Sequence, residues 1–321
     1  MSRTRVYRGG VLEQENFAPS QVSDYLAEGD TVVWLDLCTA QGDELTVISE
    51  ELKLDPHAVE DAVSRRQRPK VDRYSDHLFL SVYVAQLGES PEDLDLSEVS
   101  IFVTDRALVT VHDTAFDPKD LVARWDNAPE VVSNGVGGLL HGLLDLVVDS
   151  HFAAVQHLDD EVEDVEDVLF AEQHTKNLQK RMFALRKTLV QLRRAVLPMR
   201  EVLNTLLRRD LHVVGPDLSA TYQDVYDHTL RAAEWSESLR DMVSTIFETN
   251  LSMQDHRLNT VMKKLAGWAA IISVPTAVTG YFGQNVPYPG FGKAWGFWAS
   301  IAVMGAIGTT LYGVFRKRDW I

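Results

Sequence analysis

The stretch Y-F-G-Q-N-V-P at residues 281–287 decides the fold, because it separates two long apolar segments. The first segment covers residues 265–282, the second covers residues 295–315, and neither contains a charged side chain. Each is long enough to cross the roughly 30 Å hydrocarbon core of a bilayer as a helix. Two such helices joined by a short loop form a hairpin, so we expect both outer ends of the pair on one side of the membrane.

Basic residues mark those outer ends. A K-K pair at 263–264 precedes the first segment, and an R-K-R run at 316–318 follows the second. Lys and Arg collect on the cytoplasmic side of membrane proteins. The pattern predicts a multi-pass protein of the cell (inner or plasma) membrane with its N- and C-termini in the cytoplasm. Gln284 and Asn285 are then expected at the outer mouth of the hairpin.

The charge of the chain is distributed unevenly. From residue 263 onward there are six Lys or Arg and one acid, which leaves 25 Lys or Arg and 46 Asp or Glu in residues 1–262. An acidic excess of this size repels nucleic acid and attracts cations. We therefore expect cations and the lipid bilayer, and not nucleic acid, among the partners of this protein.

Three further parts are predicted before the membrane hairpin. Residues 1–135 alternate β-rich runs with helical patches, which indicates a cytoplasmic α/β domain. Residues 136–214 are predicted to form a long antiparallel helical hairpin, residues 215–264 a stalk helix, and residues 265–321 the transmembrane hairpin with its basic cytoplasmic tail.

Within the α/β domain, the composition predicts particular elements. The expected strands are 31–37, 78–84, 99–104 and 107–112, the last two joined as a hairpin, and the expected helices are 52–63 and 118–125. The glycine-rich S-N-G-V-G-G at 133–138 lacks the Lys-Ser/Thr of a phosphate-binding loop, and we interpret it as a linker.

One face of the stalk helix and its continuation mixes polar with apolar side chains at steps of three or four residues. Its members are Glu248, Leu251, Asp255, Leu258, Asn259, Met262, Leu265, Ala269, Ser273 and Thr276. A face against lipid would be uniformly apolar, and a dry core would not hold carboxylates among leucines. A water-filled axis shared by several copies fits this pattern. A coiled-coil seam with polar residues that set its register fits equally well.

Several stretches resemble the CorA family of divalent-cation channels, over nearly the whole chain. Gly283-Gln284-Asn285 stands where the family has Gly-Met-Asn, and the chain ends in a similar basic tail, R-K-R-D-W-I. The other similar stretches are R-P-K-V at 68–71 with Tyr74 and D-H at 76–77, L-R-K-T-L at 185–189, L-P-M-R-E-V-L at 197–203 and D-V-Y-D-H-T at 224–229. The resemblance implies an α+β membrane protein that assembles as a funnel-shaped homopentamer.

The resemblance also implies roles for residues along the pore. It identifies Gly283, Gln284 and Asn285 as the selectivity filter and places Asn259, Met262, Leu265 and Thr276 on the pore axis. The polar and apolar face adds the remaining candidates for the pore lining and gate, which are Glu248, Leu251, Leu258 and Ser273. Apolar rings on this face would close the pore by dewetting, and Asn oxygens would accept hydrogen bonds from the water ligands of Mg²⁺.

Asp224 resembles an acid of the family's regulatory cation site between neighbouring cytoplasmic domains. Its partner acid is expected in the loop at 87–93, where Glu89 is the nearest candidate. A regulatory Mg²⁺ held there would keep the channel closed while cytosolic Mg²⁺ is plentiful. The alternative is that Asp224 is an ordinary solvent-facing residue of its helix.

The expected function is a magnesium channel for Mg²⁺ influx, with Co²⁺ and Ni²⁺ as further candidate ions. Gln284 in place of Met, and a loop at 286–294 that holds Lys293 but no acid, make a zinc transporter of the same superfamily the alternative. A membrane-anchored binding module is the third interpretation. The sequence has no Walker loop, no paired Cys and no His-x-x-x-His motif, so we expect neither an enzyme nor an organic cofactor.

Overall fold

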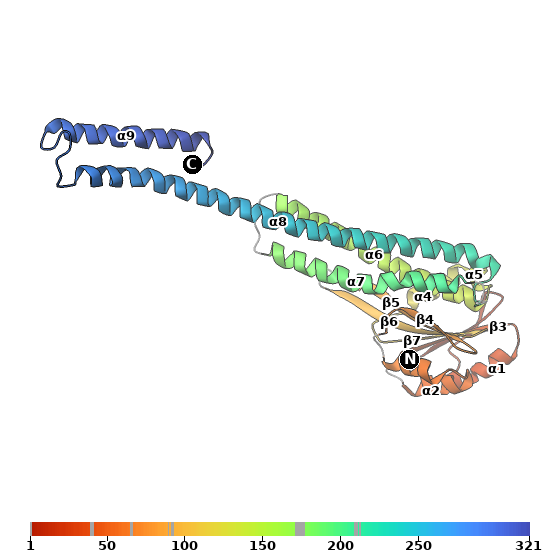
Figure 1. The fold of residues 1–321 in the computed structure, drawn as a ribbon. Helices are drawn as coiled ribbons and strands as arrows, with labels where there is room; N and C mark the ends of the chain where they lie inside the picture. The colour runs from red at the N-terminus through yellow and green to blue at the C-terminus, as the bar shows by residue number, and fades with distance from the viewer. Residues whose placement is uncertain are drawn as a thin grey trace. The chain divides into compact units, whose positions relative to one another are not determined.

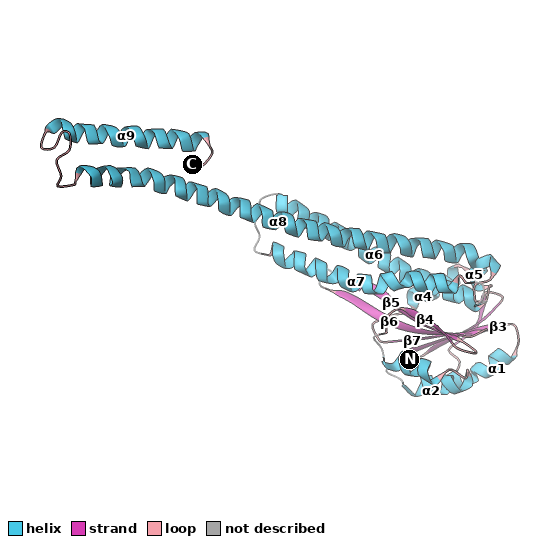
Figure 2. Cartoon of the chain, viewed as in Figure 1, coloured by secondary structure: helices cyan, strands magenta, loops and turns pink. Residues whose placement is uncertain are grey.

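The computed structural model describes residues 2–38, 42–64, 67–88, 90, 93–170, 177–208, 211 and 213–321, without the side chains of residues 42 and 43 (Figure 1). The chain divides into two compact units, Met1–Thr245 and Ile246–Ile321. The long helix α8 (Ser219–Phe282) contributes its first part to unit 1 and the rest to unit 2. The first unit contains a β-sheet with helices, and the second contains only helices and a loop (Figure 2).

Unit 1 is built on a seven-stranded sheet in the order β2-β1-β3-β7-β6-β5-β4. Its strands are β1 (Arg3–Arg8), β2 (Val11–Glu15), β3 (Thr31–Cys38), β4 (Lys70–Arg73), β5 (Leu78–Leu87), β6 (Leu94–Val103) and β7 (Ala107–His112). β3 and β7 pair in parallel, and the other neighbours are antiparallel. The four predicted strands and the hairpin between β6 and β7 are confirmed.

Helices cover both faces of this sheet, which explains why its central strands are apolar at nearly every position. One face packs against α1 (Val22–Ala27), α2 (Gly42–Glu51) and α3 (Pro56–Ser64). The other packs against α4 (Lys119–Asn127), α5 (Pro129–Val132), α6 (Val136–Phe170) and α7 (Leu178–Leu206). Alternate residues of β5 enter the two cores: Phe79 joins the first, and Leu80 joins the second. Short 3₁₀ turns lie at Pro19–Gln21 and Pro216–Leu218.

The predicted helix at 52–63 is wrong at its start, whereas the one at 118–125 corresponds to α4. α2 ends at Glu51 and Lys53 has a positive φ of 52°, which breaks the helix. α3 then begins at Pro56, after Asp55, whose side chain accepts a hydrogen bond from the backbone N–H of His57 at 2.8 Å. Asp55 therefore acts as an N-cap, and Pro56 occupies the first helical position, which suits it.

The interpretation of residues 133–138 as a linker is wrong in its second half. α6 begins at Val136 and includes Gly137 and Gly138. A Cβ atom on Gly138 would lie 2.0 Å from the carbonyl oxygen of Val131. The hydroxyl of Tyr222 donates a hydrogen bond to the carbonyl of Gly137 at 2.8 Å. The glycines therefore allow α6 to start in close contact with its neighbours.

Among the described residues, three helices are long and apolar enough to span a membrane: α6, the helical stretch Pro216–Phe282, and α9 (Ala294–Lys317). The apolar window of α6 is 67% buried inside the protein, against 6% and 0% for the other two. The apolar side chains of α6 therefore serve the core of unit 1. Its acidic run at 159–167 is partly paired with α7, because Arg181 lies 3.0 Å from Glu161 and 3.9 Å from Asp164.

Unit 2 consists of the last part of α8, a loop over residues 283–293, and α9. α8 ends at Phe282 and α9 covers Ala294–Lys317, which confirms the expected pair of C-terminal apolar helices. Most side chains of the unit are exposed in the single chain, and the buried positions are Ile246, Asn250, Gly267, Val274 and Gly296. Such exposure of leucine, isoleucine and tryptophan requires lipid or further protein around these helices.

Candidate ion pathway

The mixed face of α8 is exposed along its whole length in the single chain. The exposed fractions of Leu258, Met262 and Leu265 are 64%, 62% and 65%. Asn259 lies beside this apolar group, Glu248 and Asp255 precede it, and the remaining polar members follow it toward the end of the helix. The face therefore offers carboxylates, an apolar constriction and small hydroxyl side chains in succession.

α9 and the tail cover the other face of α8. A Cβ on Gly267 would lie 3.1 Å from Ile321 and 3.7 Å from Phe315, and Val274 is buried two turns further along. At 3.6 residues per turn, Met262 and Leu265 lie about half a turn around the helix from this contact. The covered face and the mixed face are thus different sides of one helix. The mixed face therefore remains free for contact with ions or with other copies.

The backbone at the end of α8 is closely packed around Gly283. Its N–H donates a hydrogen bond to the carbonyl of Thr279 at 2.8 Å. A Cβ at this position would lie 2.8 Å from the same oxygen, closer than real Cβ atoms approach backbone. The glycine therefore permits the turn that ends the helix. Gln284 and Asn285 follow it, and both side chains are exposed.

Tyr288 fastens the loop to the end of α8, and sequence reasoning missed it. Its hydroxyl donates a hydrogen bond to the carbonyl of Phe282 at 2.8 Å, which satisfies one of the free carbonyls of the helix end. Its ring meets those of Phe282 and Phe291 edge to face at 5.0 and 5.3 Å. A tyrosine between two prolines, Pro287 and Pro289, is the sequence signal that could have identified it.

The C-terminal tail folds back onto the helices of unit 2. The N–H of Trp320 donates a hydrogen bond to the carbonyl of Phe315 at 2.9 Å, and the two rings stack with centroids 5.4 Å apart. Asp319 has a positive φ of 56°, which turns the chain so that Ile321 lies against Gly267. The tail is thus a packed part of the hairpin, a role that its basic composition does not reveal.

Of the two proposed regulatory residues, the structure describes Asp224 only. Asp224 lies on α8 within unit 1, with 68% of its side chain exposed and its carboxylate 3.9 Å from Nδ1 of His228. Glu89 lies outside the described residues. Among the described residues no group of three or more His, Cys, Asp or Glu is placed to hold a metal ion. Asp224 would therefore need an acid from elsewhere, as expected for a site between copies.

A buried charged pair lies in the sheet of unit 1. Nε2 of His112 lies 3.0 Å from Oδ1 of Asp36, and its Nδ1 lies 2.5 Å from the carbonyl of Asp113. Since both neighbours accept hydrogen bonds, both ring nitrogens donate, as in an imidazolium. Burial alone would lower the pKa of His112, but the hydrogen bond to Asp36 and its charge raise the pKa overall. The pair is a structural feature of the β3–β7 junction.

Two apolar helical segments without charge, joined by the loop at 283–293 and attached to an acidic α/β unit, indicate an integral membrane protein. The chain belongs to the family described as CorA-like Mg²⁺ transporter protein, whose match covers residues 29–317. Proteins of this family are divalent-cation transporters and not enzymes. The expected family and its transport role are confirmed.

Relatives and solved structures agree with this assignment. The chain is 28% identical over 318 residues to the cobalt/magnesium transport protein CorA of Thermotoga maritima, covering 97% of this chain and 90% of that protein. It is 24% identical over 277 residues to the zinc transport protein ZntB of Yersinia enterocolitica, covering 85% and 83%. Its fold matches the complete CorA magnesium transporter of Methanocaldococcus jannaschii with a TM-score of 0.77 and 23% identity, over 99% of this chain and 98% of that one.

Proposed function

We propose that copies of this chain assemble into a homopentameric channel that admits Mg²⁺ through the cell membrane into the cytoplasm. The observation that carries the proposal is the mixed face of α8, which α9 leaves free and which leads to Asn285. One such face cannot enclose an ion, but several around an axis would form a pore. Assembly would also cover leucines that a single chain leaves more than 60% exposed.

The outer mouth would select the hydrated ion. Mg²⁺ holds its octahedral water shell tightly, so a filter that recognises the shell avoids the cost of removing it. A ring of Asn285 side chains would present carboxamide oxygens to the water ligands without adding charge that would trap the ion. Gly283 would set the turn that brings this ring to the axis, with Gln284 beside it.

Further along the axis, Leu258, Met262 and Leu265 would form apolar rings that close the pore when it loses water. Asn259 would offer a polar site between these rings, Ser273 and Thr276 would line the path nearer the mouth, and Glu248 and Leu251 would lie at its cytoplasmic end.

The basic outer ends of the hairpin support cytoplasmic termini. With that orientation, an inside-negative potential of 100 mV favours entry of a divalent ion by about 4.6 kcal/mol, since each charge contributes about 2.3 kcal/mol. The potential alone would therefore drive influx. The excess acid of residues 1–262 would attract the ion on the cytoplasmic side.

Cytosolic Mg²⁺ would close the channel through a site that contains Asp224 and an acid of a neighbouring copy, with Glu89 as the candidate. The exposed Asp224 carboxylate supports this role, because it is free to meet another copy. Bound Mg²⁺ would hold neighbouring bodies together, and its loss would let the carboxylates repel each other. An interface that is ordered by a bound ligand and loosens without it is a known way to control a conformational switch.

Zinc transport is the second candidate function. Gln284 replaces the usual Met of the filter, the outer loop has no acid, and one relative is the zinc transport protein ZntB. Flux into liposomes that contain the purified protein separates the candidates, with Mg²⁺, Co²⁺, Ni²⁺ and Zn²⁺ each measured with and without a proton gradient. Mg²⁺ flux that follows the membrane potential supports the proposal. Zn²⁺ flux that requires the proton gradient, without Mg²⁺ flux, would replace it.

A further inference from the structure

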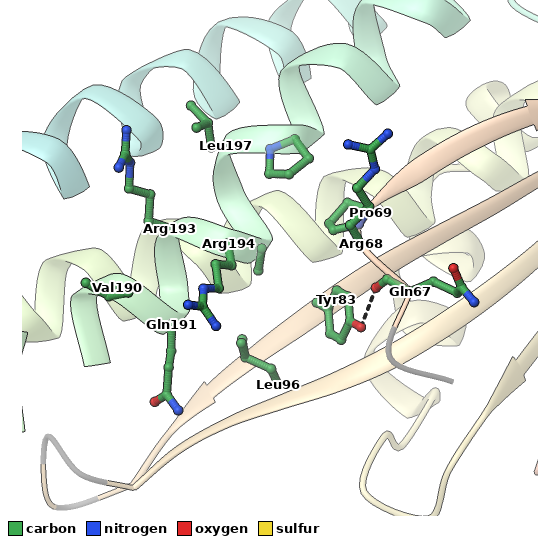
Figure 3. Close-up of a pocket in the computed structure, with 12 residues that line it drawn as sticks. Gln67, Arg68, Pro69, Tyr83, Leu96, Val190, Gln191, Arg193, Arg194 and Leu197 are labelled. Carbon is green, nitrogen blue, oxygen red and sulfur yellow. Dashed lines mark hydrogen bonds between the residues drawn. The ribbon is translucent and has the colours of Figure 1, made fainter. Parts of the chain in front are cut away.

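A cavity of about 690 Å³ lies in unit 1, between α7, the segment before β4, and strands β5 and β6 (Figure 3). This volume is within the range of pockets that hold drug-sized ligands. Its walls are mainly apolar and include Pro69, Tyr83, Leu96 and Leu197. The cavity lies far along the chain from the filter and gate residues, and the proposed ion pathway does not use it.

The tyrosine in the wall is held in place. The Tyr83 hydroxyl donates a hydrogen bond to the carbonyl of Gln67 at 2.5 Å, as the dashed line in Figure 3 shows. Burial, together with the nearby Glu98 carboxylate, raises the pKa of this hydroxyl, so it remains neutral. The carboxylate of Glu98 accepts hydrogen bonds from Ser81 and from the N–H of Gln67. The ring of Tyr83 is therefore a fixed flat surface in the cavity wall.

Arginines give the cavity a positive character, which is unusual in a chain with 47 acids and 31 bases. Arg68, Arg193 and Arg194 line it, and none of the described lining residues is acidic. Arg193 lies 3.4 Å from Glu237 and is partly neutralised. Arg68 and Arg194 are exposed and have no acidic partner among the described residues. Figure 3 shows Arg194 extending from α7 toward Leu96.

We propose that this cavity binds a nucleoside phosphate in its magnesium-free form. The flat apolar walls suit a purine or pyrimidine ring, and the exposed amide of Gln191 can pair with its polar edge. Arg68 and Arg194 suit phosphate oxygens, which guanidinium groups bind in bidentate fashion. Mg²⁺ on the phosphates occupies the same oxygens and cancels two negative charges, so the arginines prefer the free nucleotide.

Such a site would be filled when Mg²⁺ is scarce and nucleotide is no longer complexed with it. A link between this occupancy and channel opening rests on the proposed magnesium function. The binding itself does not rest on it, and a binding measurement fails or succeeds independently of ion flux.

The test is equilibrium dialysis of labelled ATP with the full-length protein in detergent, in EDTA and in excess Mg²⁺. We expect saturable binding in EDTA and affinity at least tenfold weaker in Mg²⁺. Arg194→Gln and Arg68→Gln should each weaken ATP binding about tenfold, as expected for loss of a charged hydrogen bond. Arg231→Gln is the matched control, since Arg231 is an exposed arginine of α8 outside the cavity. The affinity of this variant for ATP should equal that of the wild type.

Three results of the dialysis with ATP would overturn the proposal. The first is an absence of ATP binding by the wild type in EDTA, and the second is unchanged affinity in both cavity variants. The third is equal affinity with and without Mg²⁺, which would contradict the preference for the free nucleotide. A parallel measurement with tripolyphosphate tests the ring site. If tripolyphosphate binds as tightly as ATP, the apolar walls take no part in binding, and the nucleoside assignment is overturned.

Discussion

Gly283→Ala is the most direct test of the geometry at the mouth of the hairpin. The added Cβ would lie 2.8 Å from the carbonyl oxygen of Thr279, about 0.6 Å inside the ordinary contact limit of 3.4 Å. The neighbour is backbone, held by the hydrogen bond from the N–H of Gly283 itself, so it cannot turn aside as the end of a flexible side chain can. The turn has to change its conformation.

Overpacking of this kind costs about 1–3 kcal/mol. Since 1.4 kcal/mol is a tenfold change in an equilibrium, a cost of about 1 kcal/mol or more would leave the present turn geometry in roughly a fifth of the molecules or fewer. The side chain of Asn285 follows the turn by two residues and would leave the proposed pore axis with it. We therefore expect Mg²⁺ uptake to fall at least about fivefold, while the helices and the oligomer remain.

The assay is Mg²⁺ uptake into liposomes loaded with a Mg²⁺-sensitive dye, after light scattering has confirmed the oligomer of each variant. Gly305→Ala is the control, because a Cβ there meets nothing within 4 Å and alanine favours the helix. Uptake by Gly283→Ala at the rate of the wild type would refute the reasoning about the turn. Equal losses in both variants would assign the effect to packing of glycine residues in general.

Four further outcomes are expected. Asn285→Ala should abolish Mg²⁺ flux and leave the oligomer intact, because it removes a ring of oxygen acceptors but no core volume; wild-type flux would refute the selectivity role. Gln284→Met should change the ratio of Mg²⁺ to Zn²⁺ flux, and an unchanged ratio would remove this residue from ion choice. Asp224→Lys should make proteolysis independent of Mg²⁺, because a fixed charge replaces the ion at each interface; a variant that still needs Mg²⁺ for protection would place the sensor elsewhere. The raised pKa of His112 contributes stability that is complete below its unfolded pKa of about 6.5 and is lost as the pH rises through the folded pKa. Asp36→Asn should remove this part of the dependence of the melting temperature on pH, and an identical pH profile would contradict it.

The correct predictions from the sequence rest on local patterns. The two C-terminal apolar helices follow from runs without charge, and the end of α8 at Phe282 agrees with the last residue before Gly283. The strands of the sheet center follow from β-branched and aromatic runs. Residues 136–138 were interpreted as part of a linker because glycine is a poor helix former. Only the close contact of Gly138 with Val131 explains why a glycine occupies the first turn of α6.

The sequence by itself determined the apolar hairpin, its basic ends, and the mixed face of α8, because each of these depends on residues close together in the chain. Only the tertiary structure decided which face of α8 is covered, since this depends on Ile321 and Phe315 meeting Gly267 from some fifty residues away. The hydrogen bond from Tyr288 to the end of α8 and the arginine-lined cavity of unit 1 are likewise visible only in the tertiary structure. Such contacts arise from packing between distant segments, and no local periodicity encodes them.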